Sequence, residues 1–393
     1  NRIRATRIPC AQMDHRSRNA GSPYAPARAL LPTTLGNMTQ RHRLVVLFGG
    51  QSAEHDVSRV TARHIVAAVD PSRFIVDAIG ITRDGVWQRT AVADAITSGT
   101  VAELPAALET AGTAIEPLLA IAPTDVPVVV LPLLHGPMGE DGTVQGLLDL
   151  AGVPYVGSGV LSSSLCMDKA MAKQAASSFG IAQANWRTVH SDDITASTPT
   201  DLMNELGPVT FVKPANMGSS VGVSRSTTAE ELHEALAVAA HYDEWIVVEE
   251  AVTGREIEVG VLGNRTLEAS VPGEIVPGDA FYSYDDKYHD GVAQTLIPAA
   301  LSPEAALEVR MLACHVGQAL RVQGLARIDF FYEEHGRGFL LNEVNTMPGF
   351  TPISMFPKLW ETTGIDYPDL INRLVDLAIE RHDKRLEHRS VTH

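Results

Sequence analysis

The chain has 393 residues, of which 45% are hydrophobic and 20% are charged, and its formal net charge is −16. This length leaves room for two or three domains with a sizeable core. The negative charge argues against nucleic acid as the main partner and against an anionic membrane surface. No apolar run approaches the roughly 20 residues that a membrane span needs, so the composition predicts a soluble protein.

The start of the chain differs from the rest. Residues 1–37 carry six arginines against a lone Asp14 and show no clear periodicity. An Arg-rich, acid-poor start can resemble an organelle transit peptide, but no amphipathic helix is evident here. We therefore expect residues 1–40 to be either a disordered extension or a non-native one, and in the second case the native start would be Met38.

The cysteines exclude two kinds of architecture. Cys10, Cys166 and Cys314 are odd in number and widely spaced. This pattern favours neither a disulfide framework nor a zinc site. We expect them to be small core residues of a cytosolic protein.

Residues 41–160 show strand–loop–helix alternation, which predicts a doubly wound parallel α/β domain. Residues 84–125 have weak patterning and resemble an insertion. Ligands in such domains lie beyond the carboxyl ends of the strands, and both Glu54 and His135 follow a strand directly. Strands are expected at 44–48, 74–81, 126–134 and 153–156, and helices at 57–69 and 143–150.

Residues 161–250 form a second predicted domain, with a helix that begins near Asp168. No Walker-type phosphate loop is present. The dispersed lysines Lys169, Lys213 and Lys287 could instead clamp a polyphosphate, although each alone is more often a surface residue. The loop 217–222 could offer backbone N–H groups and two hydroxyls to phosphates, or could be a simple turn. Further elements are strands at 209–213 and 245–250 and a helix at 229–240.

Residues 251–385 form the third predicted domain, followed by a tail at 386–393. It holds a loop at 281–291, helices at 303–320 and 367–381, and a hairpin over 327–349.

The hairpin carries the most informative side chains. Period-2 alternation places Arg327 and Asp329 on one face of the first strand, and Glu343 and Asn345 on one face of the second. If the hairpin closes on Gly336, Asp329 faces Glu343, Arg327 faces Asn345, and Phe331 faces Leu341. Opposed like charges destabilise a sheet unless a cation lies between them. A hard divalent cation with oxygen ligands suits this position; the alternative is a solvated face with an ordinary Arg–acid pair.

Seven motifs occur in order over about residues 44–380, and together they resemble the D-alanine–D-alanine ligases of the ATP-grasp family. They are Gly49-Gly-Gln-Ser-Ala-Glu54-His-Asp-Val-Ser, His135-Gly-Pro-Met-Gly-Glu-Asp-Gly, Met167-Asp-Lys169, Val212-Lys-Pro, Gly218-Ser-Ser-Val-Gly, Phe281-Tyr-Ser-Tyr-Asp-Asp-Lys-Tyr288 and Arg327-Ile-Asp with Asn342-Glu-Val-Asn-Thr-Met-Pro-Gly.

The resemblance implies an ATP-grasp fold with ATP held between the central and C-terminal domains. It implies ATP-dependent ligation of two D-alanines through a D-alanyl phosphate, for peptidoglycan precursor synthesis. The expected cofactors are two Mg²⁺ ions, with Mn²⁺ as an alternative. A cytoplasmic homodimer that binds neither nucleic acid nor membrane is expected.

The resemblance also implies residue roles. Glu54 would take the ammonium group of the first substrate and join Ser219 and Tyr288 in closing a lid. Arg327, with the backbone N–H of Gly349, would stabilise an oxyanion. The catalytic residues would be Glu54, Ser219, Tyr288, Arg327 and Ser354, and the substrate-binding residues Glu54, His135, Arg327, Gly349, Ser354 and Met355. The ATP-binding residues would be Lys169, Lys213, Ser219, Ser220, Glu249, Glu250, Val252, Glu256 and Lys287, and the metal ligands Asp329, Glu343 and Asn345.

Three rival interpretations stay open. One is a relative that joins D-alanine to D-lactate or D-serine; the intact Lys287-Tyr288 pair argues against the lactate type. Another is a different ATP-grasp enzyme, which would lack the Glu54 motif. The last is a non-catalytic nucleotide-binding relative, which would have lost a metal ligand or a phosphate lysine.

Overall fold

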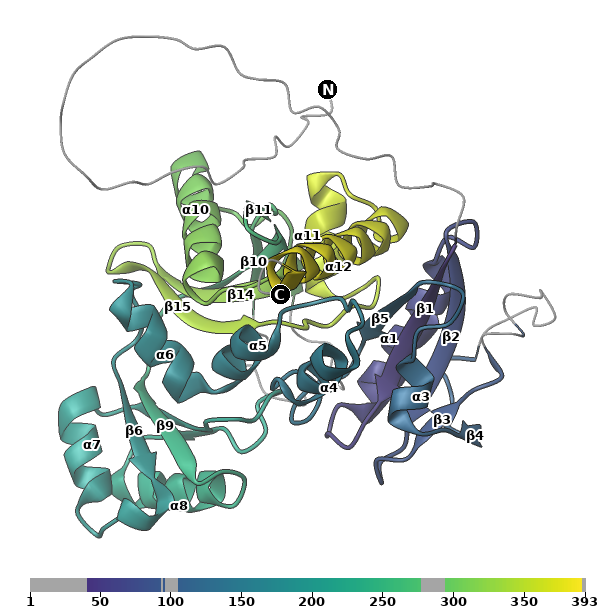
Figure 1. The fold of residues 1–393 in the computed structure, drawn as a ribbon. Helices are drawn as coiled ribbons and strands as arrows, with labels where there is room; N and C mark the ends of the chain where they lie inside the picture. Colours follow the sequence, from purple (N-terminus) through teal and green to yellow (C-terminus); the bar gives the residue numbers. More distant parts are fainter. Residues whose placement is uncertain (1–40, 93–94, 96–104, 277–293, 391–393) are drawn as a thin grey trace.

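The computed structural model describes residues 41–92, 95, 105–276 and 294–390 (Figure 1). The predicted extension at 1–40, with Cys10, and the predicted lid residues Lys287 and Tyr288 lie outside this part of the chain. Within it, the strands form a five-stranded, a four-stranded and a six-stranded sheet. Its helices include none that is both long and apolar enough to span a membrane.

The five-stranded sheet has the order β4-β3-β2-β1-β5. Strand β1 pairs in parallel with β2 and β5, as predicted, but β3 and β4 add antiparallel at the edge. The predicted insertion thus extends the sheet. The expected strand at 153–156 is wrong, because only an isolated bridge joins Val130 to Tyr155. The strands are β1 His42–Gly49, β2 Phe74–Ile81, β3 Trp87–Arg89, β4 Thr113–Ala114 and β5 Val128–Pro132.

The apolar run of β1 is buried on both faces, as a parallel strand between helices requires. Its residues Leu44 and Val46 belong to one core cluster with Ile65 of α1, and Val45 belongs to another with Leu148 of α4. This packing fixes which loops lie at the carboxyl edge of the sheet. The helices of this region are α1 His55–Ala68, α3 Pro117–Ile121 and α4 Thr143–Ala151.

Two short helices lead to the second sheet. The predicted start of α6 is confirmed, because the Asp168 side chain accepts a hydrogen bond from the backbone N–H of Met171 as an N-cap. The helix before it, α5, is not predicted from the sequence. The bounds are α5 Val160–Met167 and α6 Lys169–Ser178.

The four-stranded sheet is antiparallel, with the order β6-β9-β7-β8. Helices α7 and α8 bury Leu202 and Leu236 against Val212 and Val248 of the sheet. These two helices do not cover the opposite face of the sheet. The elements are β6 Trp186–His190, the 3₁₀ turn η1 Ser191–Asp193, α7 Thr198–Leu206, β7 Thr210–Pro214, β8 Ser224–Ser226, α8 Ala229–Ala240 and β9 Trp245–Glu250.

The six-stranded sheet has the order β13-β12-β10-β14-β15, with β11 paired to β10. Helix α10 packs on it through the cluster that contains Val309, Val259 and Ile328. Helix α12 continues past Arg381, the predicted end of this helix, to Ser390. The elements are β10 Arg255–Gly263, β11 Leu267–Ala269, β12 Gly273–Val276, β13 Gln294–Leu296, α10 Pro303–Ala319, β14 Gly324–Glu333, β15 Gly338–Asn345, α11 Met355–Thr363 and α12 Tyr367–Ser390.

Candidate active site

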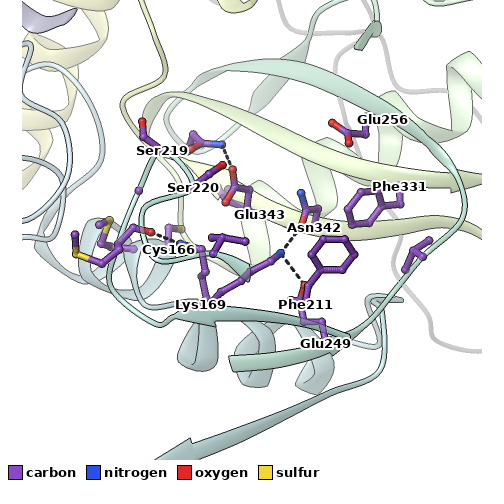
Figure 2. A pocket seen from close by; sticks show the side chains of 18 of the residues that line it. Cys166, Lys169, Phe211, Ser219, Ser220, Glu249, Glu256, Phe331, Asn342 and Glu343 are labelled. Carbon is purple, nitrogen blue, oxygen red and sulfur yellow. Dashed lines mark hydrogen bonds and ion pairs between the residues drawn. The ribbon is translucent and has the colours of Figure 1, made fainter. Parts of the chain in front are cut away.

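A cavity of about 270 Å³ lies between the four-stranded and six-stranded sheets (Figure 2). Side chains of β7 and β9 line one wall, and side chains of β14 and β15 line the other. The cavity brings together predicted residues that lie far apart in the sequence, including two proposed metal ligands. Those lining it are Lys169, Lys213, Ser219, Ser220, Glu249, Glu250, Val252, Glu256, Glu343 and Asn345.

Two of the predicted phosphate lysines meet in this cavity. The ammonium group of Lys169 donates to the carbonyl oxygen of Met217 at 2.5 Å, and burial lowers its pKa. The Nζ atom of Lys213 lies 2.7 Å from Oε2 of Glu249 and 3.4 Å from Oδ1 of Asn342. Burial would lower the pKa of Lys213, but the Glu249 carboxylate outweighs burial and raises it. Both lysines are thus held facing the cavity.

The loop 217–222 has a backbone that suits anion binding. Ser219 and Ser220 have φ values of 49° and 59°, and Gly222 has a φ of 70°. Non-glycine residues seldom adopt this left-handed conformation, which turns successive N–H groups toward one side. Two strained residues in a row, at the mouth of a cavity with two lysines, support the predicted phosphate-binding loop.

Glu54 lies against this loop, as the resemblance implies. A Cβ atom on Gly218 would stand 3.4 Å from Oε2 of Glu54 and 3.9 Å from Oε1 of Glu140. Two acidic side chains from the first domain therefore flank one glycine of the loop. Tyr288, the third member of the predicted lid set, lies outside the described residues.

Glu140 is a site residue that the sequence reasoning missed. It lines the cavity and accepts a hydrogen bond from the backbone N–H of Gly136 at 2.8 Å. Burial, followed by the charge of Glu54, raises the pKa of Glu140 to about 8. The available signal was its place in the motif that follows His135.

The register of the hairpin is confirmed where the charges lie. Asp329 pairs with Glu343, and Arg327 pairs with Asn345. The predicted partner of Phe331 is wrong, because Phe331 pairs with Leu340. The register shifts between Asp329 and Phe330, which leaves Asn342 without a partner in the pairing. Asn342 and Glu343, at this irregularity, both line the cavity.

Arg327 is held among carboxylates. Its guanidinium donates to Asp329 through two hydrogen bonds of 2.8 and 2.7 Å, and its Nε lies 3.0 Å from Oε2 of Glu258. Burial would lower the pKa of Arg327, but Asp329 and Glu258 raise it well above its ordinary value. Because Glu258 pairs with Asp329, which pairs with Glu343, three carboxylates form one row across β10, β14 and β15. The sequence reasoning missed Glu258, whose partner strand could not be assigned.

The predicted metal ligands fit a hard cation by their chemistry. Asp329 and Glu343 provide carboxylate oxygens, and Asn345 provides an amide oxygen. The Nδ2 atom of the same amide donates hydrogen bonds to Oδ2 of Asp329 at 2.9 Å and to Oε1 of Glu343 at 3.4 Å. Oxygen ligands are what Mg²⁺ prefers. Over the described residues, no cluster of three His, Cys, Asp or Glu side chains is arranged to hold a metal ion, so the fit depends on two carboxylates and one amide.

The remaining predicted substrate residues surround the loop that follows β15. His135 Nδ1 lies 3.2 Å from the carbonyl oxygen of Met347, and a Cβ on Gly349 would stand 3.3 Å from Oγ of Ser354. Ser354 accepts a hydrogen bond from the backbone N–H of Thr351 at 3.1 Å. The Met355 side chain is buried in a small apolar cluster, so we expect its backbone, rather than its side chain, to contact a substrate.

Comparisons with known proteins point to one family. Residues 43–158 match the family model described as D-ala D-ala ligase N-terminus, and residues 175–376 match D-ala D-ala ligase C-terminus. A curated D-alanine–D-alanine ligase of Bacillus pumilus is 45% identical, over 87% of this chain and 97% of its own.

Solved structures resemble most of the chain. The D-alanine–D-alanine ligase of Coxiella burnetii superposes with a TM-score of 0.74 at 31% identity, covering 90% of this chain and 99% of that chain. The VanG D-Ala:D-Ser ligase of Enterococcus faecalis superposes with a TM-score of 0.72 at 31% identity, covering 86% and 100%. The predicted ATP-grasp fold, with its N-terminal α/β domain, is confirmed.

Proposed function

Since the chain belongs to the D-alanine–D-alanine ligase family, we propose that the cavity between its two antiparallel sheets is the ATP site of the ligase. The protein is an ATP-dependent ligase that joins two D-alanines for cell wall synthesis. The observation that carries the proposed site is the convergence of Lys169, Lys213 and Glu343 in one cavity.

Lys169 and Lys213 bind the phosphates of ATP together with the N–H groups and hydroxyls of Ser219 and Ser220. Each lysine is partly buried, so water screens its charge little. The adenosine end lies toward the strand end of β9 and the start of β10. Its contacts come from Glu249, Glu250, Val252 and Glu256, all of which line the cavity.

The reaction proceeds in two steps. A carboxylate oxygen of the first D-alanine attacks the γ-phosphorus of ATP, and the bond to the β-phosphate oxygen breaks, so that ADP leaves and a D-alanyl phosphate forms. The amine of the second D-alanine then attacks the acyl carbon. The tetrahedral intermediate collapses with release of inorganic phosphate, and the attacking nitrogen loses a proton.

Arg327 stabilises the oxyanion of that intermediate, with the backbone N–H of Gly349. Preorganised donors are effective because they need no reorganisation as charge develops. The bidentate pair with Asp329 and the contact with Glu258 fix the guanidinium before substrate binds. Arg327 is thus held in a set position.

Asp329, Glu343 and Asn345 would hold divalent cations, two Mg²⁺ or, as an alternative, Mn²⁺. When bound, these ions neutralise phosphate charge during transfer.

The first domain and the loop after β15 complete the substrate site. Glu54 binds the first ammonium group, His135 lies near that substrate, and Ser354 with the backbone of Met355 docks the second carboxylate. Ser219 joins Glu54 and Tyr288 in closing the site. Lys287 and Tyr288 lie outside the described residues, and their roles rest on the family resemblance.

The larger organisation is proposed on the same basis. We propose domains at 41–160, 161–250 and 251–385, a homodimer in solution, a cytoplasmic location, and no membrane or nucleic acid partner.

Oxygen transfer tests the proposed mechanism. The protein is incubated with ATP, Mg²⁺ and D-alanine whose carboxylate carries ¹⁸O, and the released phosphate is examined by mass spectrometry. One ¹⁸O per phosphate is expected, because the carboxylate oxygen that attacks phosphorus leaves with it. Unlabelled phosphate alongside dipeptide formation would contradict the acyl phosphate.

A further inference from the structure

Lys173 lies one helical turn after Lys169 but does not line the cavity. Residues four apart share a face of a helix, so Lys173 projects on the same side of α6 as Lys169. Its side chain is 4% exposed, and a lysine this deeply buried needs a charged partner. No role in the reaction described above uses Lys173.

The partner of Lys173 is Glu249. Its Nζ lies 2.7 Å from Oε1 of Glu249, and Lys213 Nζ lies 2.7 Å from the other carboxylate oxygen, Oε2. Lys213 pairs with Val247 on β9, so Glu249 is its diagonal neighbour on the same face of the sheet. Glu249 therefore bridges two ammonium groups that come from different elements, α6 and β7.

The charges of this bridge set the net positive charge that lies beside the cavity. Burial would raise the pKa of Glu249, but Lys173 and then Lys213 lower it to about 2, so Glu249 is ionised at neutral pH. Lys173 and Lys213 carry two positive charges and Glu249 one negative charge, which leaves a net charge of +1. Only the Lys213 end of the bridge and Glu249 itself line the cavity.

We propose that Lys173 is a positioning residue that acts through Glu249 to keep the charge of Lys213 available for the phosphates of ATP. The inference rests on the proposed ATP site. Without Lys173, Glu249 would neutralise Lys213 and the bridge would carry no net charge. Glu249 thus has two places in the proposed site: it bridges the two lysines through its carboxylate oxygens, and it lines the adenosine end of the cavity.

The test compares the affinities of ATP and adenosine, measured by calorimetry without metal. Lys173→Met should raise the Kd of ATP about tenfold and change that of adenosine less than about twofold, because adenosine has no phosphate. Lys173→Met/Glu249→Gln restores a net charge of +1 and should recover most of the ratio of ATP affinity to adenosine affinity, a ratio that cancels any effect of Glu249→Gln on the adenosine end. Lys173→Arg should bind ATP like the parent protein. Lys384→Met, which removes an exposed lysine paired with Glu380 on α12, is the matched control and should change neither affinity.

If Lys173→Met weakens the binding of ATP and adenosine equally, or weakens the binding of neither, the proposal is overturned. If Lys173→Met does not fold, Glu249→Gln serves instead, because it raises the net charge to +2. That variant should strengthen ATP binding relative to adenosine, and an unchanged ratio would equally overturn the proposal. A parent protein that binds ATP no better than adenosine would instead refute the ATP site itself.

Discussion

Replacement of Arg327 by methionine keeps the side-chain length but removes the only cation that the structure shows between Glu258 and Asp329 in the described part of the site. These side chains are 19%, 11% and 10% exposed for Arg327, Glu258 and Asp329, so solvent screens the resulting repulsion weakly. Breaking a buried ion pair by removing one partner costs about 3–5 kcal/mol. A fall of the thermal unfolding midpoint by about 5–10 °C is therefore expected.

Mg²⁺ should restore much of this loss. A divalent cation supplies the missing charge, and at about a hundredfold excess over its Kd it stabilises the folded state by about 2.7 kcal/mol. Scanning fluorimetry with and without Mg²⁺ should show a larger rise in the variant than in the parent protein. The kcat for ligation should fall about 10²–10³-fold even with saturating Mg²⁺, because an oxyanion donor is lost.

Arg373→Met is the matched control. Arg373 pairs with Asp369 on the surface of α12, and loss of such a pair changes stability by less than about 1 kcal/mol. An unfolding midpoint of Arg327→Met equal to that of Arg373→Met, or an equal effect of Mg²⁺ on the midpoints of all three proteins, would show that Arg327 does not offset repulsion within the carboxylate row.

Three further predictions concern the cavity and its lid. The raised pKa of Glu140 means that the folded protein binds the proton of this carboxyl more tightly than the unfolded chain does. The free energy of unfolding should therefore fall as pH rises from 4.5 to about 8. Glu140→Gln should reduce this dependence on pH, measured by urea unfolding. A slope unchanged by Glu140→Gln would show that Glu140 ionises normally. Gly222→Ala should raise the KM for ATP several-fold and lower the free energy of unfolding by about 1–3 kcal/mol, because the new Cβ would lie 2.7 Å from Tyr242 at a φ of 70°. A wild-type KM for ATP would show that the conformation of loop 217–222 does not matter for binding. Tyr288→Phe should release more ADP than dipeptide, measured by coupled assay and mass, and a one-to-one ratio would remove Tyr288 from the lid.

Periodicity predicted most elements because their patterns are locally complete. β2, α8 and β9 begin and end where the sequence indicates, since each is bounded by turn residues or an N-cap such as Thr228. Helix α5 has no such pattern. Its serines at 162 and 163 are buried against neighbouring segments, and sequence periodicity cannot supply that tertiary context.

The charged register of the hairpin could be predicted, but its irregularity could not. The predicted pairing of Asp329 with Glu343 assumed closure of the hairpin on Gly336. In the structure Glu333 pairs with Gly338, one residue off that closure, and the register shift after Asp329 restores the predicted pairing. The shift after Asp329 depends on how β14 meets its neighbours, and no residue type marks it. Asn342 was therefore recognised as a cavity-lining residue only from the structure.

The partners of charged side chains were the least predictable part. Lys173 and Glu249 are 76 positions apart, and Arg327 meets Glu258 from another strand. These pairs depend on the packing of α6 on β9 and of β10 on β14. The family motifs identified Lys213 and Arg327, whereas only the three-dimensional arrangement shows what holds them.

Identification of the ligation product shows whether the protein joins two D-alanines. The protein is incubated with Mg·ATP and D-alanine, L-alanine, or D-alanine plus D-serine or D-lactate. The products are identified by mass spectrometry, and ADP is quantified in the same reactions. D-alanyl-D-alanine formed from D-alanine alone, with one ADP per dipeptide, is the predicted result. A mixed product preferred over D-alanyl-D-alanine, or nucleotide binding without turnover, would contradict the assignment.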